Sequence, residues 1–135
     1  MALVFHPAQG SLVIVKFEPG FIEPEMVKRR PCIVLSLAMK HRPKLLTVVA
    51  LSTTPPKPAM PFHVEIDLPF ALPMGWSQRC WVKGDMINTV GFHRTDLIQL
   101  GKDRRGKRVY QTSGLPKETL ALVQRAVLAG LGLWP

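Results

Sequence analysis

The chain has 135 residues, of which 47% are hydrophobic, and its 18 lysine and arginine residues against nine acidic ones give a formal charge of +9. This length favours one domain, 1–135, with a core that needs no metal or disulfide, and the hydrophobic content excludes a disordered chain. The charge favours an anionic partner, which is a nucleic acid, an acidic protein or an anionic membrane surface.

Membrane segments, secretion signals and zinc motifs are not expected. The sequence has no apolar run of about 18 residues, so no membrane span is predicted. The start of the chain, MALVFHPAQG, lacks the basic and long apolar segments of a secretory signal, which favours a cytoplasmic protein. Cys32 and Cys80 belong to no CxxC pair or His/Cys cluster, so we expect buried free thiols.

Three strands separated by loops are predicted in the first part of the chain. Residues 11–17 (SLVIVKF), 32–38 (CIVLSLA) and 45–53 (LLTVVALST) are rich in Val, Ile and Leu, as is typical of strands. Residues 18–30 contain two prolines and a glycine and end in the basic run KRR, so a loop is predicted there. Pro31 suits the start or the edge of a strand.

Two further strands follow. Residues 62–68 (FHVEIDL) alternate between apolar and polar side chains, which predicts a strand with one wet face. The apolar positions are Phe62, Val64, Ile66 and Leu68, and the polar ones are His63, Glu65 and Asp67. Residues 79–90 form the longest predicted strand.

The end of the chain is predicted to form a hairpin and a helix. Residues 96–100 and 107–111 flank the turn sequence DRRG, and basic side chains fill the segment 100–111. A helix is expected from Leu115-Pro116 to the glycines at 130 and 132, because proline suits a first helical turn. The apolar positions that keep helical spacing are Leu120, Val123, Val127 and Leu131. Short, mostly antiparallel strands followed by one helix predict a mainly β fold, a small curled barrel or half-barrel.

One strand segment combines opposite charges. In WVKGDMINTVGFHR, residues 81–94, Lys83 and Asp85 are two positions apart, and strand residues two apart point to the same face. We therefore expect them side by side, with Trp81 and Ile87 in the same row. Such a pair is either a surface ion pair, worth about 0–1 kcal/mol, or part of a site.

The order of several motifs resembles a known family. The segments GSLVIVKFEP, EMVKRRPCIVLS, VVALSTTP, PFHVEI and WVKGDMINTV occur in this order between about residues 10 and 98. In this respect the chain resembles the PemK/MazF toxins of type II toxin–antitoxin systems. The resemblance implies an SH3-like barrel that forms homodimers and is inhibited by an acidic antitoxin. It also implies a metal- and cofactor-independent endoribonuclease that cleaves single-stranded RNA through a 2′,3′-cyclic phosphate and so inhibits translation.

The resemblance also assigns candidate catalytic residues. Arg30 matches the family's Arg-Pro motif, where a planar guanidinium suits phosphate oxygens. Thr53 matches the Ser/Thr at the end of the third strand, where its hydroxyl would hold the scissile phosphate. Lys83 and Asp85 resemble a basic-x-acid pair, and Glu25 matches a loop glutamate. Asp85, as the general base or as a residue that orients it, and Glu25 are then the candidates for this role.

Neighbouring residues are expected to bind RNA. The basic and polar candidates are Lys28, Arg29, Ser52, His93 and Arg94. The aromatic candidates for base stacking are Trp76, Trp81 and Phe92.

Departures from the family pattern leave two other functions open. Met86 follows Asp85 where many members have glutamine, and the segment LPFALPMGWSQ and the basic hairpin are longer than in a minimal member. One alternative is a non-catalytic module that binds nucleic acid or protein. The other is a gyrase-directed toxin like CcdB, which shares the barrel and for which Trp134 would lie at the interacting C-terminal end.

Overall fold

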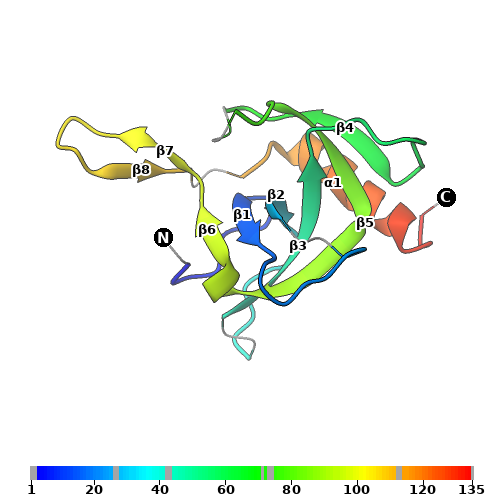
Figure 1. Ribbon diagram of the computed structural model, residues 1–135, viewed down its shortest axis with the longest axis horizontal. Coiled ribbons are helices and arrows are strands. Elements are labelled where there is room, and N and C mark those ends of the chain that lie inside the picture. Colours follow the sequence, from blue (N-terminus) through cyan, green and yellow to red (C-terminus); the bar gives the residue numbers. More distant parts are fainter. Residues whose placement is uncertain are drawn as a thin grey trace.

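The core of the protein is a six-stranded antiparallel sheet. The computed structural model describes residues 3–25, 28–41, 44–70, 72, 75–111 and 114–134. The strands are β1 (Leu12–Lys16), β2 (Arg29–Val34), β3 (Leu45–Ser52), β4 (His63–Asp67), β5 (Arg79–Gly91) and β6 (Thr95–Leu97). Their order across the sheet is β4-β5-β3-β2-β1-β6 (Figure 1). Within the described residues no pairing joins β4 to β6, and closure of the sheet into a barrel stays a prediction.

The remaining elements follow β5 in the chain. A 3-10 turn, η1 (Phe92–Arg94), leads into β6, and β7 (Gln99–Lys102) and β8 (Arg108–Tyr110) form a separate two-stranded sheet. The chain then forms one helix, α1 (Lys117–Gly130). The predicted mainly β fold with a C-terminal helix is confirmed.

The second strand differs from its prediction. β2 begins at Arg29, inside the segment expected as a loop, and ends at Val34, before the expected end at residue 38. Pro31 is tolerated because that position pairs with Ile14 of β1 only, and the pairing with β3 begins at Cys32. Arg29 and Arg30 are therefore fixed on a strand rather than on a mobile loop.

Both faces of the central strands are buried, which explains their unbroken apolar runs. One hydrophobic cluster lies between the sheet and α1 and includes Ile14, Val49, Leu51, Val82 and Val123. A second cluster lies on the opposite face and includes Val13, Val15, Phe17, Val48 and Val90. Each fully buried side chain of this size stabilises the fold by about 1.5–3 kcal/mol.

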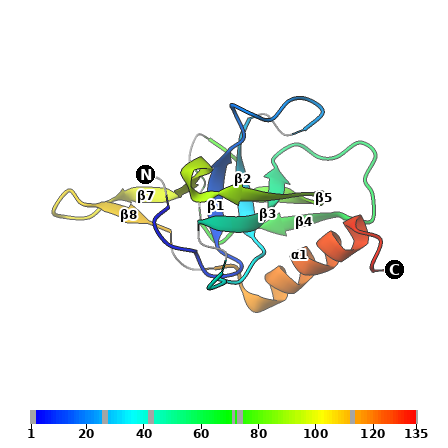
Figure 2. The ribbon, with the colours of Figure 1, turned by 90° about the horizontal axis from the view of Figure 1, so that it is seen from below.

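The helix α1 runs along one face of the sheet, against β4 and β5 (Figure 2). Pro116 is the N-cap directly before its first turn, and Glu118 lies in that turn. Val123 and Ala126 are buried, whereas Leu131 is 58% exposed. The expectation for Leu131 is wrong because the helix ends at Gly130, which turns the next residue away from the core.

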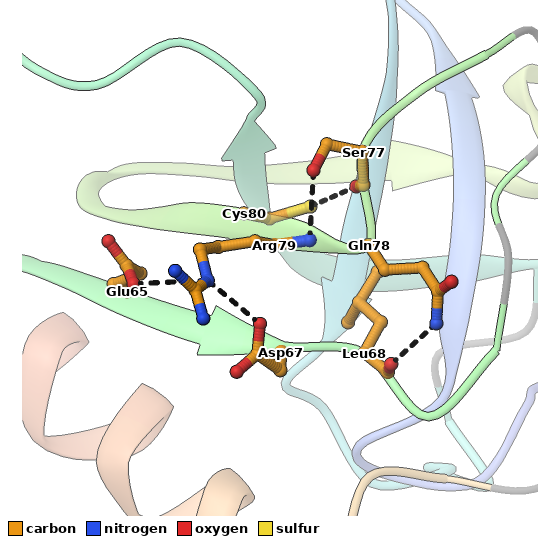
Figure 3. Close-up of polar contacts among 7 residues, drawn as sticks. All are labelled: Glu65, Asp67, Leu68, Ser77, Gln78, Arg79 and Cys80. Carbon is orange, nitrogen blue, oxygen red and sulfur yellow. Dashed lines mark hydrogen bonds and ion pairs between the residues drawn. The ribbon is translucent and has the colours of Figure 1, made fainter.

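The predicted wet face of β4 is confirmed, and it carries the ion pairs of Arg79 (Figure 3). Nε of Arg79 lies 3.1 Å from Oδ1 of Asp67 and 3.4 Å from Oε1 of Glu65. The hydrogen bond that Arg79 donates to Asp67 and the two carboxylate charges raise the pKa of Arg79. The positive charge of Arg79 is therefore already paired with carboxylates of the protein itself.

The hairpin formed by β7 and β8 projects away from the sheet (Figures 1 and 2). Oδ1 of Asp103 accepts hydrogen bonds from the backbone N–H groups of Arg105 and Lys107, at 2.8 and 2.9 Å. Gly106 closes the turn with a φ of +79°, in the left-handed region that favours glycine. The only acid of the turn thus binds backbone, which leaves the surrounding cations exposed.

Cys32 and Cys80 are free thiols with buried side chains, as expected. Burial raises the pKa of both, that of Cys80 to about 11, so both stay protonated at neutral pH.

In the described part of the chain no helix is long and apolar enough to span a membrane. The same residues contain no group of three or more His, Cys, Asp or Glu side chains placed to hold a metal ion.

Candidate active site

A basic groove crosses the surface at the start of β2. It consists of three adjoining pockets, here called pockets A, B and C. Pocket A, of about 600 Å³, is lined by Glu23, Pro24, Glu25, Lys28, Arg30, Lys83 and Met86. Pocket B, of about 300 Å³, is lined by Lys28, Arg29, Arg30, Pro31, Leu51, Thr53, Thr54 and Trp76. Pocket C, of about 400 Å³, is lined by Lys16, Glu18, Lys28, Arg29 and Trp76.

Arg30 forms the wall shared by pockets A and B. It is held on β2 opposite Val15, and its side chain is half-buried. Its Nε is buried and has no hydrogen-bond partner among the described residues. An unsatisfied buried donor costs about 1–3 kcal/mol, more when the group is charged, and an anion in the groove would remove that cost.

Lys83 reaches pocket A because β5 is irregular at this point. Val82 pairs with Leu51 and Ile87 with Val49, so four residues of β5 lie opposite one residue of β3. Such a bulge breaks the alternation of the strand. Lys83 and Met86, three positions apart, consequently line the same pocket.

Asp85 does not line this groove. The expected single row of Trp81, Lys83, Asp85 and Ile87 is wrong, because the bulge lies between its members. Asp85 is exposed where β5 meets α1, and it forms no ion pair with Lys83 among the described residues. The expectation assumed a regular strand, in which residues two positions apart share a face. The bulge removes that condition for Lys83 and Asp85.

Glu25 lines pocket A together with Arg30 and Lys83. It lies in the loop between β1 and β2, where its Oε1 accepts a hydrogen bond from the N–H of Ile22 at 3.0 Å. The N–H of Glu25 in turn donates to the carbonyl of Ile22 at 2.8 Å, so the turn is closed from both sides. One carboxylate oxygen of Glu25 remains without a hydrogen bond within the described residues.

Arg94 fastens the same loop from outside the groove. Its Nη1 donates to the carbonyls of Lys16 and Phe17 at 3.3 and 3.0 Å, and its guanidinium lies 5.2 Å from the ring centre of Phe21. These contacts bind η1 to the beginning of the β1–β2 loop. Arg94 therefore positions the loop that carries Glu25.

Thr53 and Ser52 have different positions at the end of β3. Thr53 is exposed and lines pocket B. Ser52 is buried, and its Oγ both donates to the carbonyl and accepts from the N–H of Thr54, each at 3.2 Å. Ser52 thus fixes the turn that presents Thr53 and Thr54.

Three other candidates lie outside the groove. His93 is exposed on η1 and lines none of the three pockets. Phe92 packs against the second hydrophobic cluster. Trp81 is half-buried on β5, opposite Glu65 and Ser52. Of the three aromatic candidates, the structure brings only Trp76 into the groove.

Some lining residues escape sequence reasoning. Glu18 and Lys16 lie at the end of β1, and nothing in the spacing relates them to Trp76, which is about 60 positions away. The place of Met86 in pocket A depends on the bulge in β5, which the spacing of residues does not reveal. A glycine inside a strand, Gly84, was the available signal for that irregularity.

Comparison with known proteins identifies the family and related folds. Residues 8–131 match a family described as PemK-like, MazF-like toxin of type II toxin-antitoxin system. No curated protein matches the sequence significantly. MazF from Deinococcus radiodurans has a similar solved structure, with a TM-score of 0.59, 26% identity and coverage of 95% of this chain and 98% of that one.

Two mycobacterial structures share the fold at lower identity. An endoribonuclease in complex with its cognate antitoxin from a mycobacterial species has a TM-score of 0.62 and 19% identity, covering 96% of this chain and 100% of its own. The Mycobacterium tuberculosis toxin MazF-mt6 has a TM-score of 0.58 and 16% identity, covering 91% and 97%. The family match spans nearly the whole chain, and it confirms the resemblance carried by the motifs. The chain belongs to the PemK-like, MazF-like toxins of type II toxin–antitoxin systems.

Proposed function

We propose that this toxin is an endoribonuclease that cleaves single-stranded RNA in the basic groove without a metal ion or other cofactor. The observation that carries the proposal is the position of Arg30 between two pockets of the groove. Its buried Nε has no hydrogen-bond partner among the described residues. The Arg30 side chain also forms the wall between pocket A, which contains the carboxylate of Glu25, and pocket B, which contains the hydroxyl of Thr53. A phosphodiester needs these three kinds of group together when a neighbouring 2′-hydroxyl attacks it.

The reaction assigns one task to each side chain. The carboxylate of Glu25 takes the proton of the 2′-hydroxyl, and the resulting oxygen attacks phosphorus. Arg30 binds the phosphate oxygens and balances the charge of the pentavalent state, and the hydroxyl of Thr53 orients the phosphate. The bond from phosphorus to the 5′-oxygen breaks, and the ammonium of Lys83, a stronger acid than a guanidinium, protonates that oxygen. The products are a 2′,3′-cyclic phosphate and a 5′-hydroxyl.

Glu25 is preferred to Asp85 as the base because of position. Glu25 lines the same pocket as Arg30 and Lys83, whereas Asp85 lies outside it at the junction of β5 with α1. A general base must reach the proton that it removes, so geometry decides before pKa.

Other residues bind RNA or support the groove. Lys28 and Arg29 line the pockets and contact phosphates along the strand. Ser52 and Arg94 act indirectly, by holding the Thr53 turn and the β1–β2 loop. His93, on η1, contacts RNA only where the strand extends beyond the groove.

The biological setting of the proposal follows from charge and family. With a formal charge of +9, the toxin is inhibited by an acidic antitoxin that covers Arg30. The solved relatives include an endoribonuclease with its cognate antitoxin and a MazE-MazF complex from Deinococcus radiodurans. We place the toxin in the cytoplasm, with residues 1–135 acting as one domain and two copies forming a homodimer.

A cleavage assay tests the activity. Purified protein is incubated with a mixed-sequence single-stranded RNA in EDTA, and the fragment ends are analysed. Discrete fragments with 2′,3′-cyclic phosphate ends are expected. A folded protein that binds this RNA without cutting it would indicate the non-catalytic module instead. Loss of gyrase supercoiling activity without RNA cleavage would indicate a CcdB-like toxin acting through exposed Trp134.

A further inference from the structure

Pocket C contains a group of side chains that phosphate chemistry does not require. Trp76 lines both pocket B and pocket C, so it lies beside the proposed reaction centre and extends away from it. Lys16, the last residue of β1, and Glu18, two residues later, line pocket C together with Trp76. The pocket therefore combines an indole, a carboxylate and cations next to the place where RNA would be cut.

Trp76 has the surroundings of a rigid stacking surface. It is half-buried and packs against the first hydrophobic cluster, which limits its motion, while the rest of the side chain faces the groove. A tryptophan held in this way binds an unpaired base by stacking, whatever the identity of the base. Trp76 thus supplies affinity for a base but not selectivity.

The cations around Trp76 suit a phosphate on each side of that base. Lys16 and Arg29 lie directly opposite each other on β1 and β2, and like charges at paired positions are destabilising. Lys28 adds a third positive charge to the same pocket. A polyanion in the groove would relieve this repulsion.

Glu18 is the one acidic side chain lining pocket C. It is exposed and forms no hydrogen bond or ion pair within the described residues, although three cations line the same pocket. A carboxylate repels phosphate, so its presence in an RNA groove requires another purpose. Carboxylates accept hydrogen bonds from the donor groups on base edges.

We infer that Trp76 and Glu18 form a base-specificity subsite that selects guanine next to the scissile phosphate. Guanine presents two adjacent donors, N1–H and the 2-amino group, which match the two oxygens of a carboxylate. Uracil presents one N–H between two carbonyl oxygens, which a carboxylate repels. Adenine and cytosine present an amino group beside a ring acceptor, so each offers only one hydrogen bond.

This inference rests on the proposed ribonuclease function, and the experiment separates the two. Cleavage sites of wild-type protein on a mixed-sequence RNA are sequenced alongside those of Glu18→Gln, with Glu118→Gln on α1 as the matched control. Guanine is expected at one fixed position within a nucleotide or two of the cut. Glu18→Gln is expected to reduce cleavage at these sites by roughly 10- to 100-fold relative to other bases, and Glu118→Gln is expected to change nothing.

Inosine tests the same contact at the level of one atom group. Inosine keeps N1–H but lacks the 2-amino group of guanine. Replacing the selected guanine by inosine should slow wild-type cleavage and should have much less effect on Glu18→Gln. An equal loss in both proteins would overturn the role of Glu18.

Variants of Trp76 test the stacking surface separately. Trp76→Phe keeps an aromatic ring, whereas Trp76→Leu keeps apolar packing and removes stacking. Affinity for a short guanine-containing RNA, measured by fluorescence polarisation, should fall roughly 10- to 100-fold in Trp76→Leu and much less in Trp76→Phe. Trp134→Leu is the matched control, because Trp134 is exposed at the far end of the chain.

The outcomes distinguish the subsite from the enzyme. Cleavage by wild-type protein with the same base preference in Glu18→Gln would overturn the subsite and leave the ribonuclease intact. Guanine-dependent binding that requires Glu18 without any cleavage would support the subsite and overturn the ribonuclease. Absence of both would overturn both.

Discussion

Gly84 of β5 and Gly130 of α1 touch backbone to backbone. A Cβ on Gly130 would lie 2.6 Å from the carbonyl oxygen of Gly84, and one on Gly84 would overlap the carbonyl oxygen of Ala126. The helix therefore rests directly on the strand where the bulge occurs. Gly84 lies between Lys83, which lines pocket A, and Asp85, which does not.

Substitution of Gly84 should destabilise the protein. Gly84→Ala forces β5 and α1 apart, and overpacking of this kind costs about 1–3 kcal/mol, occasionally more. Urea unfolding measures the change, with Gly114→Ala as control because the nearest atom to its Cβ would lie at an ordinary 3.4 Å. Equal stability of Gly84→Ala and wild type would contradict the close packing of strand and helix.

The two candidate bases give opposite expectations. Glu25→Gln should lower the cleavage rate by about 100-fold or more, since general base catalysis contributes roughly 10²–10⁴. Asp85→Asn should change the rate by less than about threefold, because Asp85 lies outside the groove. Single-turnover rates across pH compare the two variants. A large loss in Asp85→Asn with normal folding would assign the base to Asp85 instead.

Arg94 should act through the loop and not through RNA contacts. Arg94→Ala removes two hydrogen bonds and the contact with Phe21, which should cost about 1–3 kcal/mol and loosen the β1–β2 loop. Hydrogen exchange should accelerate at the N–H of Phe21, and cleavage should fall as Glu25 loses its position. His93→Ala, on the same turn, should leave both measurements unchanged when the RNA substrate is too short to extend beyond the groove. If His93→Ala impaired cleavage more than Arg94→Ala, the anchoring role would be contradicted.

The buried thiol of Cys80 should make stability fall at high pH. Burial raises its pKa from 9.0 to about 11, so between these values the unfolded chain has lost a proton that the folded protein keeps. Ionisation then favours the unfolded state, and the free energy of unfolding declines as pH rises above about 9. Urea unfolding between pH 8 and 11 should show a smaller decline for Cys80→Ala than for wild type. Parallel curves would contradict the effect of burial.

Much of the fold was predictable because several strands either have both faces buried or alternate between apolar and polar side chains. The apolar runs at 11–17 and 45–53 correspond closely to β1 and β3, and the alternation at 62–68 corresponds to β4. The predicted bounds of β2 were shifted along the chain because Arg29 and Arg30 are typical of a loop. Only their pairing with β1 places them on a strand. Local charge carries no information about such tertiary pairing.

The groove was predictable only in part, for a related reason. The placement of Arg30, Thr53, Glu25 and Lys83 around adjoining pockets followed from matching motifs in order. The position of Asp85 was wrong because a bulge changes which residues share a face, and sequence spacing assumes none. Glu18 and Trp76 meet only through the folding of distant segments, which no short motif records.

The most direct test of the proposed site compares Arg30→Ala, Arg30→Lys and Arg79→Ala in single-turnover cleavage of RNA with EDTA present. Arg79 is an ideal control, because its charge is already paired with Glu65 and Asp67 away from the groove. Arg30→Ala is expected to lose about 10²–10³ in rate, Arg30→Lys to recover only part of it, and Arg79→Ala to cleave like wild type. Cleavage by folded Arg30→Ala at the wild-type rate would show that the reaction does not take place beside Arg30.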